Sequence, residues 1–142
     1  MTLKSKNNMD NKQLINFAYD AMDMAYAPYS HYKVGAAVYT NGKVYLGCNI
    51  ENASYGATIC AERCAIAKAV SEGNLNLEKI AIVSSTHDFT APCGICRQVM
   101  NEFMPEGVVV LTNDREIKEF LVSDLLPTGF SQTDMKGLSH GE

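Results

Sequence analysis

The sequence lacks the marks of a membrane protein and of a secreted protein. None of its apolar runs approaches the ~20 residues that a helix needs to cross a bilayer. Residues 1–11 are polar, with Lys4 and Lys6 among them, and do not include the apolar segment of a secretory signal. We therefore expect a cytoplasmic protein without a membrane partner.

A surplus of basic residues is also missing. The 12 Lys and Arg residues are outnumbered by 16 Asp and Glu residues, so the formal net charge is −4. A protein that follows a nucleic-acid backbone needs a basic stripe to neutralise phosphates. The charge balance therefore favours a small neutral or weakly charged substrate over a nucleic acid.

The number of cysteines is odd. The five cysteines are Cys48, Cys60, Cys64, Cys93 and Cys96. An odd count in a chain with no export signal argues against a disulfide framework. We expect reduced thiols that are available to a metal ion.

Length and composition predict one domain with one core. The chain has 142 residues, of which 46% are hydrophobic and 20% charged, as in ordinary globular domains. We see no internal repeat and no linker to a second domain. The domain is placed at residues 12–136, with a flexible N-terminal extension at 1–11 and a C-terminal tail at 137–142.

Hydrophobic periodicity predicts three helices and five strands. The helices are expected at 13–25, 60–72 and 94–104, and the strands at 34–39, 44–49, 80–84, 108–111 and 117–122. Asn41-Gly42 joins the first two strands and favours the positive φ angles of a tight hairpin. A helix between the strands at 80–84 and 108–111 implies a right-handed crossover and parallel pairing. The fold class is therefore α/β, with a mixed sheet of about five strands and helices on its faces.

Three cysteines and a glutamate form the most informative pattern. Cys60-Ala61-Glu62 is followed about thirty residues later by Pro92-Cys93-Gly94-Ile95-Cys96. Both motifs fall at predicted helix N-termini, whose partial positive charge stabilises thiolates. Three thiolates can hold Zn²⁺ and leave its fourth tetrahedral position open, which distinguishes catalytic from structural zinc.

Glu62 and Arg63 suit a catalytic zinc site. Glu62 lies two residues after Cys60, where its carboxylate can stand beside the metal without binding it and shuttle a proton. Three thiolates leave the site with a net charge of −1. Arg63 can donate to the thiolates and offset part of that charge.

Two other interpretations of the cysteines stay open at this point. Cys-x-x-Cys also occurs in redox proteins, and a structural zinc site would need a fourth ligand. The candidates for that ligand are Cys64, one helical turn after Cys60, and then Cys48, His31 and His87. We expect His31, His87 and His140 at the surface, and Cys48 in the core.

Several linked stretches resemble the small homotetrameric cytidine deaminases, from about residue 14 to residue 130. The stretches are Ala27-Pro28-Tyr29-Ser30, Val34-Gly35-Ala36-Ala37, Gly47-Cys48-Asn49-Ile50-Glu51-Asn52-Ala53, Cys60-Ala61-Glu62-Arg63, Pro92-Cys93-Gly94-Ile95-Cys96-Arg97-Gln98, and Leu125-Leu126-Pro127 with Phe130. The resemblance implies a three-layer α/β/α fold with one Zn²⁺ per subunit. It also implies hydrolysis of a cyclic amidine: cytidine and deoxycytidine would lose their 4-amino group as ammonia, in pyrimidine salvage.

The resemblance also assigns roles to individual residues. Cys60, Cys93 and Cys96 would bind zinc, Glu62 would be the proton shuttle, and Asn49 and Glu51 would hold the ribose 3′-hydroxyl. Phe130 would stack on the base in an adjacent subunit's site, which requires a homotetramer or a similar assembly. Tyr32 is a departure, since relatives often have Phe in this part of the base pocket; its hydroxyl needs a partner or water.

Two alternatives to cytidine deamination remain. One is a deaminase of a related aminopyrimidine nucleoside such as blasticidin S, and the other is a non-catalytic structural-zinc module. The Asn49-x-Glu51 pair and the Leu125-Leu126-Pro127 stretch favour cytidine, and Glu62 beside the cysteines counts against the module.

Overall fold

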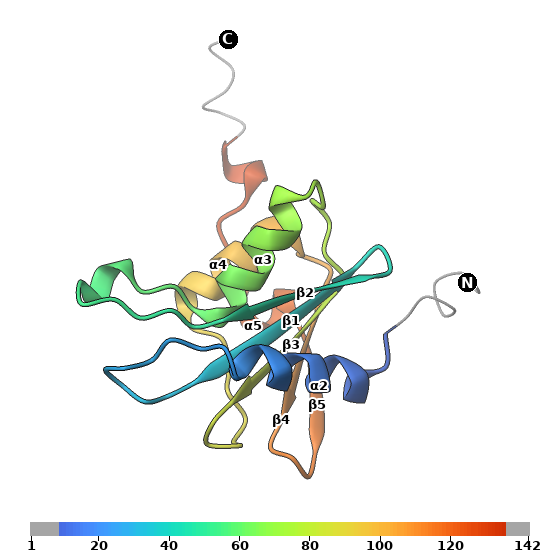
Figure 1. Ribbon diagram of the computed structural model, residues 1–142. Coiled ribbons are helices and arrows are strands. Elements are labelled where there is room, and N and C mark those ends of the chain that lie inside the picture. The colour runs from blue at the N-terminus through green and yellow to red at the C-terminus, as the bar shows by residue number, and fades with distance from the viewer. Residues whose placement is uncertain (1–8, 136–142) are drawn as a thin grey trace.

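The computed structural model describes residues 9–135, and it has a mixed five-stranded sheet between two layers of helices. The sheet order is β2-β1-β3-β4-β5. The strands are β1 (Val34–Thr40), β2 (Lys43–Cys48), β3 (Lys79–Ser84), β4 (Val108–Thr112) and β5 (Ile117–Leu121). Helix α2 (Asn11–Met22) covers one face, and α3 (Ala61–Ser71) and α4 (Gly94–Phe103) cover the other (Figure 1). The predicted α/β class, mixed sheet and three layers are confirmed.

Some of the expectations concern residues that the structure does not describe. Most of the predicted extension at 1–11, the tail at 137–142 and His140 lie outside residues 9–135. No helix in the described part of the chain is long and apolar enough to span a membrane.

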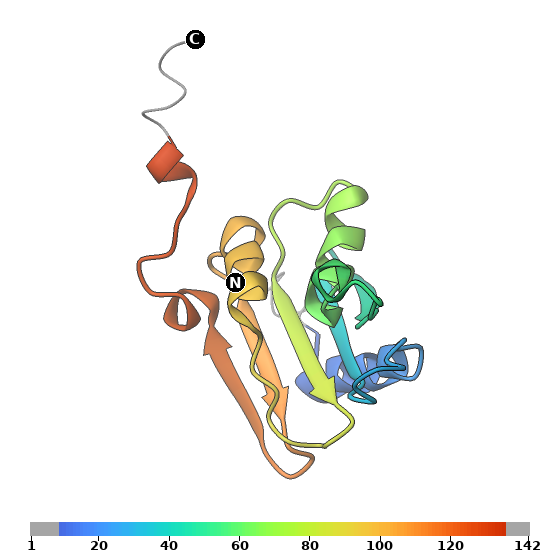
Figure 2. The ribbon, with the colours of Figure 1, turned by 90° about the vertical axis from the view of Figure 1, so that its left-hand side faces the viewer.

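The hairpin and the parallel strand pair form as the sequence predicts. Strands β1 and β2 pair antiparallel, and the turn between them has φ of 51° at Asn41 and 76° at Gly42. Strand β3 pairs with β4 in parallel through the crossover that contains α4, and β5 returns antiparallel to β4. Figure 2 shows β5, β4 and β3 side by side in this order.

Helix α2 and strand β5 end earlier than predicted, and tertiary pairing explains both ends. Helix α2 ends at Met22 rather than at residue 25, because the chain then pairs with the segment after β2: the Tyr26 N–H donates to the Asn49 carbonyl over 3.0 Å. Strand β5 ends at Leu121, and the fully buried Val122 begins a short helix, α5 (Val122–Leu125), that we did not predict. The Val122 N–H donates to the Gly107 carbonyl over 3.1 Å, which turns the chain away from the sheet.

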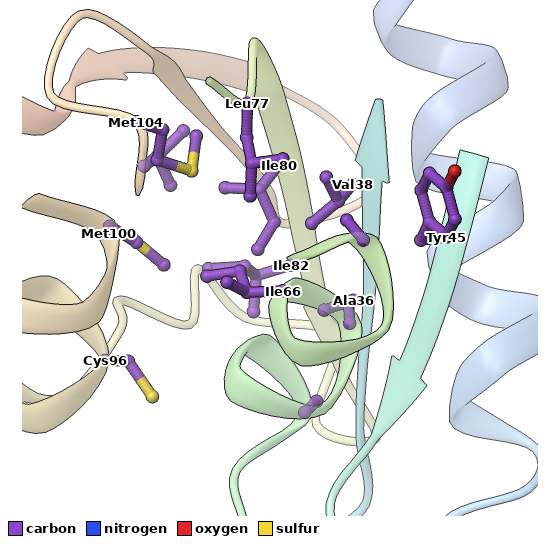
Figure 3. Close-up of a cluster of buried hydrophobic side chains, with 14 of the residues drawn as sticks. Ala36, Val38, Tyr45, Ile66, Leu77, Ile80, Ile82, Cys96, Met100 and Met104 are labelled. Carbon is purple, nitrogen blue, oxygen red and sulfur yellow. The ribbon is translucent and has the colours of Figure 1, made fainter. Parts of the chain in front are cut away.

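The sheet carries a hydrophobic core on each face. The larger core packs β1 and β3 against α3 and α4, and Figure 3 shows Met104, Met100 and Cys96 in a row along α4 facing Ile66, Ile80 and Ile82. The smaller core lies under α2. Because β1 is buried along its whole length, it is the central support of both cores. Cys96, at one end of this row, is also part of the cysteine motif.

Strand β2 and helix α3 are in backbone contact at Gly47. A Cβ atom at Gly47 would lie 2.3 Å from the Ala65 nitrogen and 2.5 Å from the Ala61 carbonyl oxygen. Only glycine permits this approach, which fixes the first turn of α3, where Cys60 and Glu62 lie.

We predict that Gly47→Ala destabilises the protein by about 1–3 kcal/mol and weakens its metal affinity, because α3 must move away from the sheet. Chemical denaturation and competition with a zinc chelator measure the two effects. Gly56→Ala is the matched control, since a Cβ atom at Gly56 meets nothing within 4 Å. Equal stability and metal affinity in the two variants would contradict this account of the contact.

Candidate active site

Two helix N-termini bring the three predicted cysteine ligands together. Cys60 is the N-cap of α3, and its carbonyl accepts from the Cys64 N–H over 3.1 Å. Cys93 is the N-cap of α4, and its carbonyl accepts from the Arg97 N–H over 2.9 Å. Cys96 lies in the first turn of α4 and is buried. The sulfurs therefore gather where the positive ends of two helix dipoles meet.

The three sulfurs fit a tetrahedral zinc ion. All three lie within 4.8 Å of one another, and the Cys60 and Cys93 sulfurs are 3.8 Å apart. Zn–S bonds of ~2.3 Å in a tetrahedron place the sulfurs ~3.8 Å apart. Within residues 9–135, no fourth Cys, His, Asp or Glu belongs to this cluster. The set therefore suits Zn²⁺ with one coordination position left to water or substrate.

The candidates for a fourth ligand lie elsewhere. Cys64 is close enough to Cys48 for a charge on Cys64 to raise the pKa of the Cys48 thiol, to which burial contributes more. Cys48 is half-buried rather than in the core, because β2 is an edge strand. His31 and His87 are exposed, as predicted, and His87 pairs with Asp114 at 2.5 Å. The described residues thus give a four-ligand structural site no support.

The electrostatics of the cluster favour a thiolate at Cys60. Hydrogen bonds, first from Cys96 and then from Arg63 and Cys93, lower the pKa of Cys60 to about 5 despite its partial burial. The pKa of Cys96 is raised, because its thiol hydrogen-bonds to Cys60 and is buried. Cys60 is therefore the thiolate of the cluster, and Cys96 would lose its proton on binding a metal ion.

Glu62 is a buried carboxylate beside the cluster. Its side chain is only 4% exposed, and burial raises its pKa to about 7. The negative charge of Cys60 raises this pKa further, while a hydrogen bond from the Glu62 backbone and the charge of Arg63 lower it. A carboxyl group that exchanges its proton near neutral pH is suited to general acid and base work.

Arginine side chains brace both motifs. The Arg63 guanidinium donates to the Cys60 sulfur over 3.7 Å and to the Thr58 carbonyl over 3.5 Å. Arg97, to which sequence reasoning gave no role, donates to the Pro92 carbonyl over 2.7 Å and to the Leu125 carbonyl over 3.0 Å. It thereby ties the start of α4 to α5. The signal in the sequence that could have pointed to Arg97 was its position within the Pro92–Gln98 stretch.

Asn49 and Glu51 are held by the loop that precedes β1. The Asn49 side chain is buried; its oxygen accepts from the Val34 N–H over 2.9 Å, and its amide donates to the Tyr32 carbonyl over 2.8 Å. Glu51 accepts from the N–H groups of Tyr29 and Ser30 over 3.0 and 3.1 Å, and from the Ser30 hydroxyl. These bonds, first that from the Ser30 hydroxyl, lower the pKa of Glu51, so it is an ionised acceptor at neutral pH.

A cavity of about 350 Å³ opens beside Glu51. Its lining is polar and aromatic and consists of Tyr29, Ser30, Glu51, Asn52, Tyr55 and Thr58. The Tyr29 and Tyr55 rings contact edge to face, with centroids 6.2 Å apart. The segment 55–59, which had no assigned role, therefore contributes to this cavity.

Tyr32 and Phe130 are the two remaining predicted site residues. Tyr32 is 38% exposed, and its hydroxyl lies 3.3 Å from the Thr90 hydroxyl. The Phe130 side chain is 58% exposed, while its carbonyl accepts from Gln98 and Asn101 on α4. The backbone at Phe130 is therefore anchored, and its side chain is accessible.

We predict that Cys64→Ser retains one zinc per chain, whereas the same change at Cys96 reduces zinc affinity at least ~10-fold, because only Cys96 belongs to the sulfur cluster. Elemental analysis after dialysis and competition with a chromogenic chelator measure both. Loss of zinc in the Cys64 variant would restore the four-ligand interpretation.

Comparisons with known proteins agree with this geometry. The sequence profile for the "Cytidine and deoxycytidylate deaminase zinc-binding region" matches residues 8–112. A cytidine deaminase from Halalkalibacterium halodurans is 48% identical over 130 residues, covering 89% of this chain and 98% of that protein. A probable cytidine deaminase from Dictyostelium discoideum is 44% identical over 131 residues, covering 91% of this chain and 89% of that protein.

Solved structures give the same result. The crystal structure of a cytidine deaminase from Burkholderia pseudomallei is 49% identical and superposes with a TM-score of 0.82, covering 86% of this chain and all of that one. The crystal structure of a cytidine deaminase from Mycobacterium tuberculosis is 38% identical and superposes with a TM-score of 0.78. The match covers 87% of this chain and 98% of that one. The sulfur cluster, the fold and these relatives together establish that the chain belongs to the cytidine and deoxycytidylate deaminase family of zinc enzymes.

Proposed function

We propose that the protein hydrolyses cytidine and deoxycytidine to uridine and deoxyuridine with release of ammonia, as a cytoplasmic enzyme of pyrimidine salvage. One observation carries the proposal: a cluster of three cysteine sulfurs that can hold a metal ion lies beside Glu62, a buried carboxyl group whose pKa is raised to about 7. The relatives named cytidine deaminase support the choice of nucleoside.

Each group in the site has a part in the reaction. Cys60, Cys93 and Cys96 would hold Zn²⁺, which when bound would lower the pKa of a water molecule for its attack on C4 of the base. Glu62 takes one proton of that water and passes it to the ring nitrogen N3; it then takes the second proton, from the new C4 hydroxyl, and gives it to the amine, which leaves as ammonia while the C4 carbonyl of uridine forms. Because the same oxygen atoms must accept and donate, an amide cannot replace the carboxylate.

The remaining residues position the nucleoside. The Asn49 amide has a second hydrogen and Glu51 has free lone pairs, so both can bind the ribose 3′-hydroxyl while keeping the loop contacts described above. The Tyr32 ring forms a wall for the pyrimidine. Arg63 offsets the negative charge of the thiolates. If an Arg63→Ala variant keeps its zinc content and its turnover, Arg63 does not have this role.

We predict that zinc-loaded wild-type protein converts cytidine to uridine, and that Glu62→Gln reduces kcat by ~10²–10⁴-fold at unchanged zinc content, because the proton shuttle is lost. The ultraviolet change on deamination measures turnover. Glu72→Gln, an exposed position at the end of the same helix, is the matched control and should keep full activity.

The outcomes separate the alternatives. Turnover of blasticidin S without turnover of cytidine or deoxycytidine would transfer the assignment to a related deaminase. Zinc retained with no turnover of any of these nucleosides would favour the structural-zinc module.

The active assembly in this proposal is a homotetramer in which Phe130 reaches an adjacent subunit's site. The exposure of Phe130 supports this, as do the other exposed apolar side chains on the segments around the site: Tyr26, Ile50, Tyr55, Ile59 and Ile95. A monomer would leave these side chains in water.

We predict that mixed assemblies of Glu62→Gln and Phe130→Ala subunits are more active than either variant alone. A Phe130→Ala subunit keeps its own Glu62 and can receive an intact Phe130 from a Glu62→Gln neighbour. Refolding or co-expressing the two variants and assaying against each homo-oligomer measures the gain. Activity equal to the mean of the parents would contradict a site completed across subunits, and light scattering reports the subunit number.

A further inference from the structure

Tyr32 is held at all three of its polar groups. Its N–H donates to the Ser30 hydroxyl over 3.0 Å, and its carbonyl accepts from the Asn49 amide over 2.8 Å. Its own hydroxyl lies 3.3 Å from the Thr90 hydroxyl. Ser30 in turn binds Glu51, so Tyr32 is connected to both residues assigned to the sugar.

The contact to Thr90 continues into a directed chain of hydroxyl groups. Thr90 donates to the Ser84 hydroxyl over 2.7 Å, with the Asp88 carbonyl 3.1 Å away, and the Ser84 and Thr86 hydroxyls are 3.0 Å apart. A threonine hydroxyl has one proton, and that of Thr90 is used in these bonds. This leaves a lone pair of the Thr90 oxygen to accept from the Tyr32 hydroxyl. Since Ser84 is buried at the end of β3, the chain is anchored in the sheet.

This chain links the two halves of the site. Thr90 lies three residues before the zinc ligand Cys93, and Tyr32 lies two residues before β1. The phenol hydroxyl thus joins the loop that leads into α4 to the loop that carries the sugar-binding contacts. A phenylalanine at this position would lack the connection.

We propose that Thr90 is a positioning residue: through the Tyr32 hydroxyl it fixes the aromatic wall of the base pocket and so raises affinity for the nucleoside. The inference rests on the proposed function, in which the Tyr32 ring faces the pyrimidine. Thr90 itself does not touch the reacting atoms; it acts through Tyr32.

A double-mutant cycle tests the proposal. The zinc-loaded Glu62→Gln protein serves as the background, because it binds cytidine without consuming it, and calorimetry gives the Kd. We expect Thr90→Val to raise the Kd about 5-fold, the equivalent of one hydrogen bond, and Thr90→Ser to restore it. In a Tyr32→Phe background the same Thr90→Val change should raise the Kd less than about 2-fold. With Glu62 intact, Thr90→Val should raise KM more than it lowers kcat.

The control variant leaves the contact between Tyr32 and Thr90 intact. Tyr45→Phe removes a phenol hydroxyl at the sheet edge, where it contacts Glu72 and Asn74, and should leave the Kd unchanged. An equal effect of Thr90→Val in both backgrounds, or a Thr90→Ser variant as weak as Thr90→Val, would overturn the inference alone. Failure of the protein with Tyr32 and Thr90 unchanged to bind or turn over cytidine would overturn the proposed function and the inference with it.

Discussion

The site depends on the meeting of two helix N-termini at one end of the sheet. Helices α3 and α4 each begin at a cysteine, and their dipoles favour the negative charge that three thiolates carry. The backbone contact at Gly47 fixes α3 against β2, and the core row from Met104 to Cys96 fixes α4. The cysteines are thus placed by packing of the fold and do not depend on a flexible loop.

The opposite side of the site is built by hydrogen bonds between loops. Asn49, Glu51 and Tyr32 each bond to neighbouring backbone or side chains in addition to their proposed contacts with the nucleoside. A side chain that is already held loses less conformational entropy when it binds a ligand. The same contacts connect the segment proposed to hold the sugar to the loop before Cys93.

The sequence predicted much of this arrangement because the signals are local. Asn41-Gly42 specifies the hairpin, the cysteine motifs coincide with helix starts, and the apolar runs of β3 and β4 indicate a parallel pair. The end of α2 and the existence of α5 were missed because they depend on pairing with Asn49 and Gly107, which are distant in sequence. Arg97 and Thr90 were missed for the same reason: their partners are carbonyl and hydroxyl groups that only the fold brings near.

The central claim is that sulfur alone supplies the protein ligands of one zinc ion and that a fourth position faces Glu62. X-ray absorption at the zinc edge of the loaded protein tests it most directly. The account predicts three sulfur neighbours at ~2.3 Å and one oxygen or nitrogen at ~2.0 Å, with the lighter neighbour altered by a bound nucleoside analogue. Four sulfur neighbours, unchanged by the analogue, would contradict it.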